Sequence, residues 1–227
     1  MLKEFYKDNL NAKEAKEEIQ KLTFYPMMFQ AARVMRNNGV LNETYLNRKT
    51  GIDPKTIAEK LGLTFYTVNT LLEVGLTTGL VYLKKDDFYS ITKMGFHLLM
   101  DEATRVNMDF THDVCYKSMF HLEEAFEHGI PAGLHEIGLH DSTIYPGLSK
   151  LEEPIKTSWF DFDHYYSDNA FPDALKLIFN SEDKPKHMVD IGGNTGKWSL
   201  KCCEMDSEVK MTILDLPGQW NKAKENI

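Results

Sequence analysis

A glycine-rich segment near residue 190 has the residue types and spacing most typical of a ligand-binding site. Residues 189–198 read Val-Asp-Ile-Gly-Gly-Asn-Thr-Gly-Lys-Trp. A tight loop between a strand and a helix lets a ligand approach the backbone, and the first turn of the helix offers free N–H groups. We therefore predict a ligand-binding loop at this position.

The spacing of these glycines separates two ligand classes. Dinucleotide sites have the pattern G-x-G-x-x-G, which matches only once in three positions when it starts at Gly192. The pattern acidic-x-G-x-G-x-G matches at Asp190, Gly192 and Gly196, and departs only at Asn194. Asparagine tolerates a left-handed backbone better than other non-glycine residues, so this departure is mild. The phosphate-loop sequence G-K-[ST] is absent.

A second carboxylate supports a nucleoside as the ligand. Asp215 ends the next apolar run, 23 residues after Gly192. A carboxylate in that position can accept hydrogen bonds from both hydroxyls of a ribose. The structural alternative is a glycine turn together with an aspartate that caps a helix.

Two strands and a helix are expected to position this loop. Residues 187–191 and 209–215 are apolar runs of strand length, and residues 197–205 have a helical pattern. This order predicts a parallel βαβ unit, the opening of a doubly wound α/β fold. Upstream, we expect an aromatic-rich helical stretch over 157–180 and a long helix over 104–129, whose core candidates are Met108, Val114, Met119, Leu122 and Phe126.

The first hundred residues predict helices followed by a hairpin. One helix is expected to start at the N-cap Asn11, and a second to follow Pro26. Shorter helices are expected after the caps Asp53 and Thr64, then a β-hairpin over 79–91. Helix, turn, helix and hairpin form the winged-helix arrangement.

Three motifs together resemble the S-adenosylmethionine-dependent O-methyltransferases of the acetylserotonin/caffeate and polyketide-tailoring type. They are Asp190-Ile-Gly-Gly-Asn-Thr-Gly, Leu214-Asp-Leu-Pro, and the block Gly79-Leu-Val…Phe88-Tyr-Ser-Ile-Thr-Lys-Met-Gly. The resemblance extends over nearly the whole chain and implies a mixed α and α/β fold. It implies a winged-helix dimerisation domain at 1–105, a helical connector lining the substrate pocket at 106–180, and the first, incomplete βαβ unit of a Rossmann-like methyltransferase domain at 181–227.

The resemblance also implies the cofactor S-adenosyl-L-methionine and roles for matching residues. Backbone of the loop would line its methionine part, Asp190 would lie near its amino group, Asp215 would bind its ribose, and Leu216 would pack on its adenine. The expected cofactor-binding residues are Asp190, Gly192, Gly193, Asn194, Gly196, Asp215 and Leu216. On the aromatic stretch, Phe160, His164 and either Ser167 or Asp168 fall near the family's substrate positions; the alternative is an aromatic core helix.

No catalytic residue can be carried over. The family's base is a histidine well downstream of the second strand, and all eight histidines here precede Gly192. We therefore expect an N-terminal portion of a longer enzyme, inactive by itself, whose complete form methylates a hydroxyl of a small aromatic or polyketide-like acceptor. A homodimer formed through the N-terminal domain is expected.

Two other functions compete with methyl transfer: a winged-helix DNA-binding regulator and a catalytically inert dimerisation module. The distribution of charge argues against the first. The net charge is −8, and residues 1–100 carry 14 Lys/Arg against 11 Asp/Glu. The helix that would enter DNA, within 64–79, has Glu73 as its only charged residue. DNA binding needs cations, so no nucleic-acid partner is expected.

Composition limits the remaining classes. Without an 18-residue apolar run or an N-terminal signal, we expect a cytoplasmic protein with no membrane partner. Three cysteines without a C-x-x-C pair predict reduced thiols. His135 and His140 flank Glu136 at a spacing unlike that of zinc proteases, so no metal site is predicted.

Overall fold

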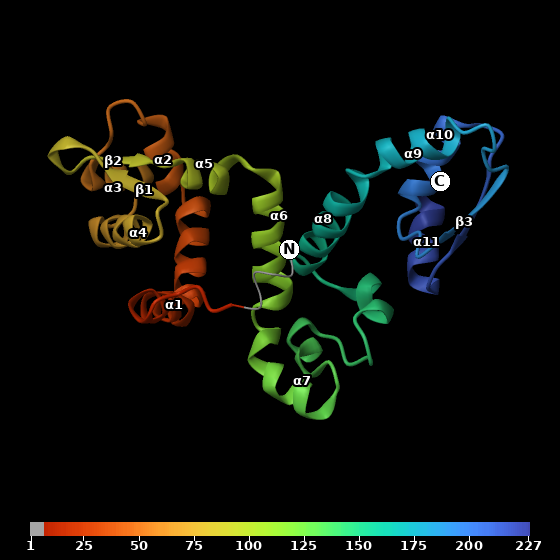
Figure 1. Cartoon of the computed structure of the whole chain (residues 1–227), viewed down its shortest axis with the longest axis horizontal. Coiled ribbons are helices and arrows are strands. Elements are labelled where there is room, and N and C mark those ends of the chain that lie inside the picture. Colours follow the sequence, from red (N-terminus) through yellow and green to blue (C-terminus); the bar gives the residue numbers. More distant parts are fainter. Residues whose placement is uncertain (1–6) are drawn as a thin grey trace. The chain divides into compact units, whose positions relative to one another are not determined.

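The computed structural model describes residues 7–227 (Figure 1), so the first six residues of the expected domain 1–105 lie outside it. The chain divides into two compact units, Met1–Arg105 and Val106–Ile227, and each is described by itself. Among the described residues, no helix combines the length and the apolar character needed to cross a membrane.

Helix α1 (Ala12–Asn37) opens the first unit and begins where predicted. The Asn11 side chain accepts the N–H groups of Lys13 and Glu14, and the Glu14 carboxylate accepts the Asn11 N–H. The predicted separate helix after Pro26 is wrong, because Pro26 lies inside α1. A proline removes one helical hydrogen bond and kinks the axis without always ending the helix, and Figure 1 shows α1 changing direction along its length.

Helices α2 (Val40–Leu46) and α4 (Phe65–Thr77) pack on α1, and α3 (Pro54–Leu61) packs on α4 and α2. The predicted caps are confirmed, since the side chains of Asp53 and Thr64 accept N–H groups of the first turns of α3 and α4. The core of the unit consists of fully buried apolar side chains: Met35, Val40, Leu41, Ile57, Val68 and Leu72.

The predicted hairpin is also confirmed. Strand β1 (Val81–Leu83) pairs antiparallel with β2 (Tyr89–Ile91), and Val81 lies opposite Ile91. A 3-10 turn at Lys85–Asp87 connects the strands. Helix α5 (Lys93–Met100) follows, with Thr92 as its N-cap.

The predicted long helix over 104–129 is wrong, because it is broken into pieces. Helix α6 (Glu102–Phe110) runs into a π-turn (Thr111–Cys115), a 3-10 turn (Ser118–His121) and then α7 (Leu122–His128). The break occurs where the chain packs against the 3-10 turn Ala132–Ile137, to which Ser118 donates a hydrogen bond.

The prediction of a continuous buried face on that long helix is also wrong. Of its expected core residues only Val114 is buried, whereas Met119, Leu122 and Phe126 are exposed. A helix that changes from π to 3-10 geometry no longer keeps one face toward the core, because each change alters the turn per residue.

The rest of the second unit holds the expected βαβ unit. Helices α8 (Ile155–Asp168) and α9 (Phe171–Phe179) come first, after a 3-10 turn at Tyr145–Lys150. Strands β3 (His187–Ile191) and β4 (Lys210–Leu214) are parallel, with Asp190 opposite Ile213. Helices α10 (Lys197–Met205) and α11 (Pro217–Asn226) follow β3 and β4 (Figure 1).

The two faces of the β3–β4 sheet differ in burial. The face toward α9 and α10 is half-buried and lies beside a small core of Leu175, Phe179, Cys202 and Val209. The other face leaves Val189, Ile191 and Leu214 exposed. Helices therefore cover one face of the sheet, and the other face has exposed apolar side chains.

Candidate functional site

The backbone of the glycine loop follows directly from its sequence. The Gly192 N–H donates to the Leu214 carbonyl oxygen at 2.8 Å, which extends the β3–β4 pairing by one residue. The Gly196 N–H then donates to the Gly193 carbonyl oxygen at 2.8 Å, closing a turn. Left-handed φ angles occur at Gly192 (+73°), Asn194 (+49°) and Gly196 (+76°). Asn194 therefore takes the left-handed conformation that its place in the glycine pattern predicts.

The glycines differ in what surrounds them. A Cβ at Gly193 would lie 2.8 Å from both the Asp190 Oδ2 and the Ile213 Cγ2 atoms, so a side chain there would collide with β3 and β4. A Cβ at Gly192 would meet no atom within 4 Å. Gly193 thus packs the loop against the sheet, while the backbone at Gly192 borders open space that a ligand can approach.

The Asp215 carboxylate contacts the glycine loop with one oxygen and its own backbone turn with the other. Its Oδ2 atom accepts the Asn194 N–H at 2.6 Å, and its Oδ1 atom accepts the Leu216 N–H at 2.6 Å. A carboxylate has about four acceptor positions, so these bonds leave capacity for the hydroxyls of a ligand. The end of β4 is thereby joined to the middle of the loop.

Asp190 is held in a similar way at the end of β3. Its Oδ2 atom accepts a hydrogen bond from the Ser199 hydroxyl at 2.7 Å. Ser199 is buried on the first turn and a half of α10, so the carboxylate is turned toward the helix that follows the loop. The structure therefore brings together all the residues expected to bind the cofactor, from Asp190 through the loop to Leu216.

Helix α8 contributes carboxylates to the same loop. The Asn194 side-chain amide donates to Asp163 Oδ2 at 2.6 Å, and Lys197 pairs with Asp168. Asp163 and Lys197 were missed by sequence reasoning, and the only available signal was a set of carboxylates among the aromatic residues of 159–168. The Oδ1 atom of Asn194 is buried and has no hydrogen-bond partner within residues 7–227.

The candidate substrate residues lie on this same helix. The rings of Phe160 and His164 stack, with centroids 6.2 Å apart and an interplanar angle of 26°. His164 Nδ1 is 3.6 Å from Asp168 Oδ1, and Asp168 also pairs with Lys197 at the start of α10. Phe160 and His164 are thus connected to the glycine loop through one carboxylate.

Helix α10 also carries two neighbouring cysteines with opposite environments. Cys202 is fully buried and Cys203 is exposed, so one thiol points into the core and the other toward solvent. Burial, with a smaller contribution from the Asp190 carboxylate and Cys203, raises the pKa of the Cys202 thiol to about 11. Burial also raises the pKa of Cys115.

This difference predicts the order in which the thiols are alkylated in the native protein. Because the thiolate is the reactive form, Cys203 should react with iodoacetamide first, Cys115 slowly, and Cys202 only after unfolding. Mass mapping of peptides after timed alkylation measures the order, and protein in urea, where all three should react, is the control. Equal native rates for Cys202 and Cys203 would contradict the orientation of α10.

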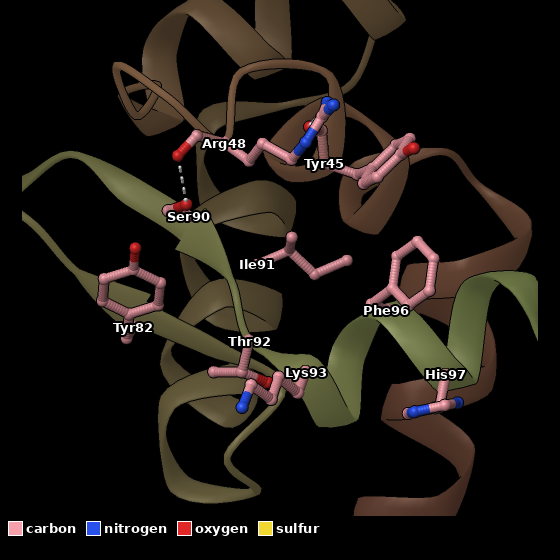
Figure 2. A pocket seen from close by; sticks show the side chains of 9 residues that line it. All are labelled: Tyr45, Arg48, Tyr82, Ser90, Ile91, Thr92, Lys93, Phe96 and His97. Carbon is pink, nitrogen blue, oxygen red and sulfur yellow. Dashed lines mark hydrogen bonds between the residues drawn. The ribbon is translucent and has the colours of Figure 1, made fainter.

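The first unit has an open pocket of about 470 Å³ beside the hairpin, shown in Figure 2. Tyr45 and Phe96 lie next to each other with ring centroids 5.6 Å apart, and the Arg48 guanidinium lies 4.6 Å from the centre of the Tyr45 ring. None of its nine lining residues is a carboxylate. The pocket therefore offers no carboxylate for a pair of ribose hydroxyls, which makes the glycine loop the better nucleoside site.

Comparisons with known proteins bear on both units. Residues 16–88 match the family model of the Dimerisation2-like domain. A comparison with curated proteins found no match. Among solved structures, the chain is similar to human N-acetylserotonin methyltransferase in complex with SAM, with 16% sequence identity and a TM-score of 0.64 over 97% of this chain and 64% of that one.

Two further methyltransferase structures give similar values. The chain is similar to the mitomycin 7-O-methyltransferase MmcR, with 18% identity and a TM-score of 0.67 over 93% of this chain and 61% of that one. It is also similar to NcsB1, an O-methyltransferase from neocarzinostatin biosynthesis, with 21% identity and a TM-score of 0.59 over 87% and 59% of the two chains.

The chain has a methyltransferase fold. It spans about three fifths of the length of these solved structures. The similarity includes the S-adenosylmethionine-dependent methyltransferase SibL, with 17% identity and a TM-score of 0.65. The resemblance expected from the three sequence motifs is thereby confirmed.

Proposed function

We propose that this protein binds S-adenosyl-L-methionine at the loop between β3 and α10. The observation that carries the proposal is Asp215, which lies at the end of β4 and is hydrogen-bonded to the backbone of Asn194. This carboxylate is hydrogen-bonded to a loop in which three residues have left-handed φ angles. It can accept hydrogen bonds from ribose hydroxyls while the loop backbone faces the rest of the ligand. The solved complex of human N-acetylserotonin methyltransferase with SAM, which has the same fold, supports this choice of ligand.

The residues present fit such a cofactor. Gly192 borders open space, and the buried Oδ1 atom of Asn194 lacks a donor that a ligand amine or hydroxyl can provide. Asp190 is positioned for an ammonium group, Asp215 for the ribose, and Leu216, which is 42% exposed, for the face of an adenine. When bound, the cofactor supplies an electrophilic methyl group on a sulfonium.

For the reaction, we propose methyl transfer to a hydroxyl of a small aromatic or polyketide-like acceptor. Phe160 and His164 would form the acceptor side of the pocket, because α8 carries them toward the residues that contact the loop. Stacking and hydrogen bonding there would orient the acceptor oxygen in line with the methyl group. The name of the similar mitomycin 7-O-methyltransferase supports the hydroxyl as the acceptor group.

The fold details form part of the same proposal. We assign α2, α3, α4, the hairpin and α5 to a winged-helix dimerisation domain, and β3, α10 and β4 to the first βαβ unit of a Rossmann-like domain. The segment between them would be the helical connector. The match of residues 16–88 to the Dimerisation2-like domain supports the first assignment.

Calorimetric titration with S-adenosylmethionine and with S-adenosylhomocysteine tests cofactor binding. We expect saturable binding of both ligands with one site per chain. A protein that shows neither heat of binding nor thermal stabilisation at millimolar ligand would refute cofactor binding. A stable dimer with that result would instead favour a catalytically inert dimerisation module.

DNA binding has less support than methyl transfer. Helix α4, which would enter a groove, contains no Lys or Arg, and Phe65 and Tyr66 are its most exposed large side chains. Phosphate neutralisation requires cations on such a surface. A gel-shift assay at low salt should therefore show no salt-sensitive complex.

We further propose that α1 forms a homodimer interface. The helix leaves a run of large apolar side chains exposed around Pro26: Ile19, Leu22, Phe24, Tyr25 and Met27. Because helical spacing distributes these five side chains around α1, a partner that wraps or crosses the helix is needed to remove them from water. A second copy of the chain would cover it, which agrees with the family match of residues 16–88.

The double substitution Leu22→Glu and Met27→Glu should convert the dimer to a monomer, since two carboxylates would be buried in the interface. Sedimentation velocity measures the change. Phe126→Glu, at an 80% exposed position in the second unit, is the matched control and should leave the dimer intact. A monomeric parent protein, or an unchanged double variant, would contradict the interface.

A further inference from the structure

Two histidines and a glutamate outside the glycine loop meet at one point of the second unit. His121 ends the 3-10 turn Ser118–His121, and His135 and Glu136 lie on the 3-10 turn Ala132–Ile137. Glu136 Oε1 is 3.1 Å from His121 Nε2 and 3.5 Å from His135 Nε2. The three potential ligand atoms all lie within 4.8 Å of one another.

These separations match the edges of a tetrahedral metal site. Zinc–nitrogen and zinc–oxygen bonds of about 2.1 Å at tetrahedral angles place two ligand atoms roughly 3.4 Å apart. The two measured separations to Glu136 Oε1 lie on either side of that value. Small side-chain adjustments would therefore bring all three atoms to bonding distance of one cation.

The hydrogen bond of the His135 ring to the backbone leaves its Nε2 atom, which faces Glu136, available to bind a cation. Its Nδ1 atom is 2.6 Å from the Ala132 carbonyl oxygen, which can only accept, so Nδ1 carries the proton. In the neutral ring, Nε2 then has a free lone pair directed toward Glu136. Metal-bound histidines characteristically donate their other N–H to a backbone carbonyl or a carboxylate in this way.

His121 has the same arrangement with a carboxylate in the outer position. Its Nδ1 atom is 3.6 Å from Glu124 Oε2, on the opposite side of the ring from Glu136. Both nitrogens therefore face a carboxylate. With a cation at His121 Nε2, the proton on Nδ1 would point to Glu124. The Glu136 carboxylate would then face the cation, and the Glu124 carboxylate would face the N–H donor.

The fold holds the two turns close enough to form this group. A Cβ at Gly133 would lie 2.4 Å from the Ser118 carbonyl oxygen, so only glycine permits the approach of the two backbones. The Ser118 hydroxyl donates to the Gly133 carbonyl oxygen at 2.8 Å and fixes their relative position. The rings of His121 and His135 meet edge to face with centroids 4.3 Å apart.

We propose that His121, His135 and Glu136 form a binding site for a divalent transition-metal cation, with Zn²⁺ as the best match. Two imidazole nitrogens and one carboxylate oxygen suit zinc, and a water completes the tetrahedron. The bound cation links the turn after α6 to the turn after α7. Sequence spacing indicated no such site because His121 lies 14 residues before His135, and the pair His135 and His140 has the wrong separation.

Zinc titration of the EDTA-treated protein by calorimetry tests the site. A Cys203→Ser background removes the exposed thiol as a competing ligand. We expect one Zn²⁺ per chain. Loss of an outer partner of a ligand already costs about 10-fold or more, so loss of a ligand itself in His121→Ala, His135→Ala or Glu136→Gln should weaken binding by more than about 10-fold. Glu124→Gln should weaken it less, and His140→Ala and His128→Ala are matched controls that should leave it unchanged.

Cobalt provides a second measurement that a folding defect would not mimic. Co²⁺ at the site should give the intense visible absorption of tetrahedral coordination, and Glu136→Gln, with its folding verified by circular dichroism, should abolish it. Absence of zinc binding by the parent protein would overturn the proposal. Zinc binding that all three ligand substitutions leave unchanged would also overturn it, because the cation would then lie elsewhere.

Discussion

Replacing Asp215 with alanine is expected to weaken binding of S-adenosylmethionine by roughly 100-fold. The two ribose hydroxyls would lose their hydrogen bonds to the carboxylate. Hydrogen bonds to a charged group contribute about 1.5–3 kcal/mol each. Tenfold in affinity corresponds to about 1.4 kcal/mol, so a loss near 3 kcal/mol gives this factor. The side chain also accepts the Asn194 N–H, so its removal frees the middle of the glycine loop.

Calorimetric titration of parent and variant measures the change in affinity. Asp215→Asn separates the two roles, because an amide oxygen still accepts one N–H but loses the charge and one acceptor. We expect its affinity to fall between those of the parent and the alanine variant. Asp173→Ala removes an 87% exposed carboxylate from α9 and is the matched control.

Two outcomes would change the interpretation of Asp215. If Asp215→Ala binds S-adenosylmethionine as tightly as the parent, the ribose assignment is wrong although the protein binds cofactor. If the alanine variant binds more weakly and Asp215→Asn is unaffected, the residue acts mainly by holding the Asn194 backbone. In that case the loop conformation, rather than the carboxylate charge, determines affinity.

The strand, loop and helix around Asp190 could be predicted from sequence because their determinants are local. Glycine and asparagine mark the left-handed positions, and alternating apolar residues mark the strands. The structure agrees at Gly192, Asn194 and Gly196, and the parallel pairing of β3 with β4 is confirmed. The caps at Asn11, Asp53 and Thr64 were predictable for the same reason, since a cap involves residues within three positions of one another.

Features that depend on distant contacts could not be predicted in this way. The contact between Asn194 and Asp163 joins residues 31 positions apart, and only the tertiary fold brings α8 to the loop. The break after α6 depends on the close approach of Ser118 and Gly133, which helical periodicity does not encode. Pro26 by itself predicts a helix boundary, but burial of Ala32 and Met35 keeps the second half of α1 in place.

Gly95→Ala should destabilise the first unit by about 3 kcal/mol, near the upper end of the usual cost of overpacking. A Cβ at this position of α5 would lie 2.1 Å from the Leu80 carbonyl oxygen and 2.8 Å from Ile91 Cγ1. The Leu80 oxygen cannot move away freely, because it accepts the Thr92 N–H at 3.0 Å. The helix would have to separate from the hairpin, which breaks the junction between β2 and α5.

The sign of this effect distinguishes packing from helix propensity. Alanine in the middle of an unobstructed helix stabilises by about 1 kcal/mol relative to glycine, so a stabilised variant would show that α5 does not contact Leu80 as described. Urea denaturation followed by far-ultraviolet circular dichroism measures the change. Gly79→Ala is the matched control: its Cβ would meet no atom within 4 Å, and its φ of +74° should cost only about 1–2 kcal/mol. The larger loss at Gly95, where the backbone conformation suits alanine, would therefore come from the collisions with Leu80 and Ile91.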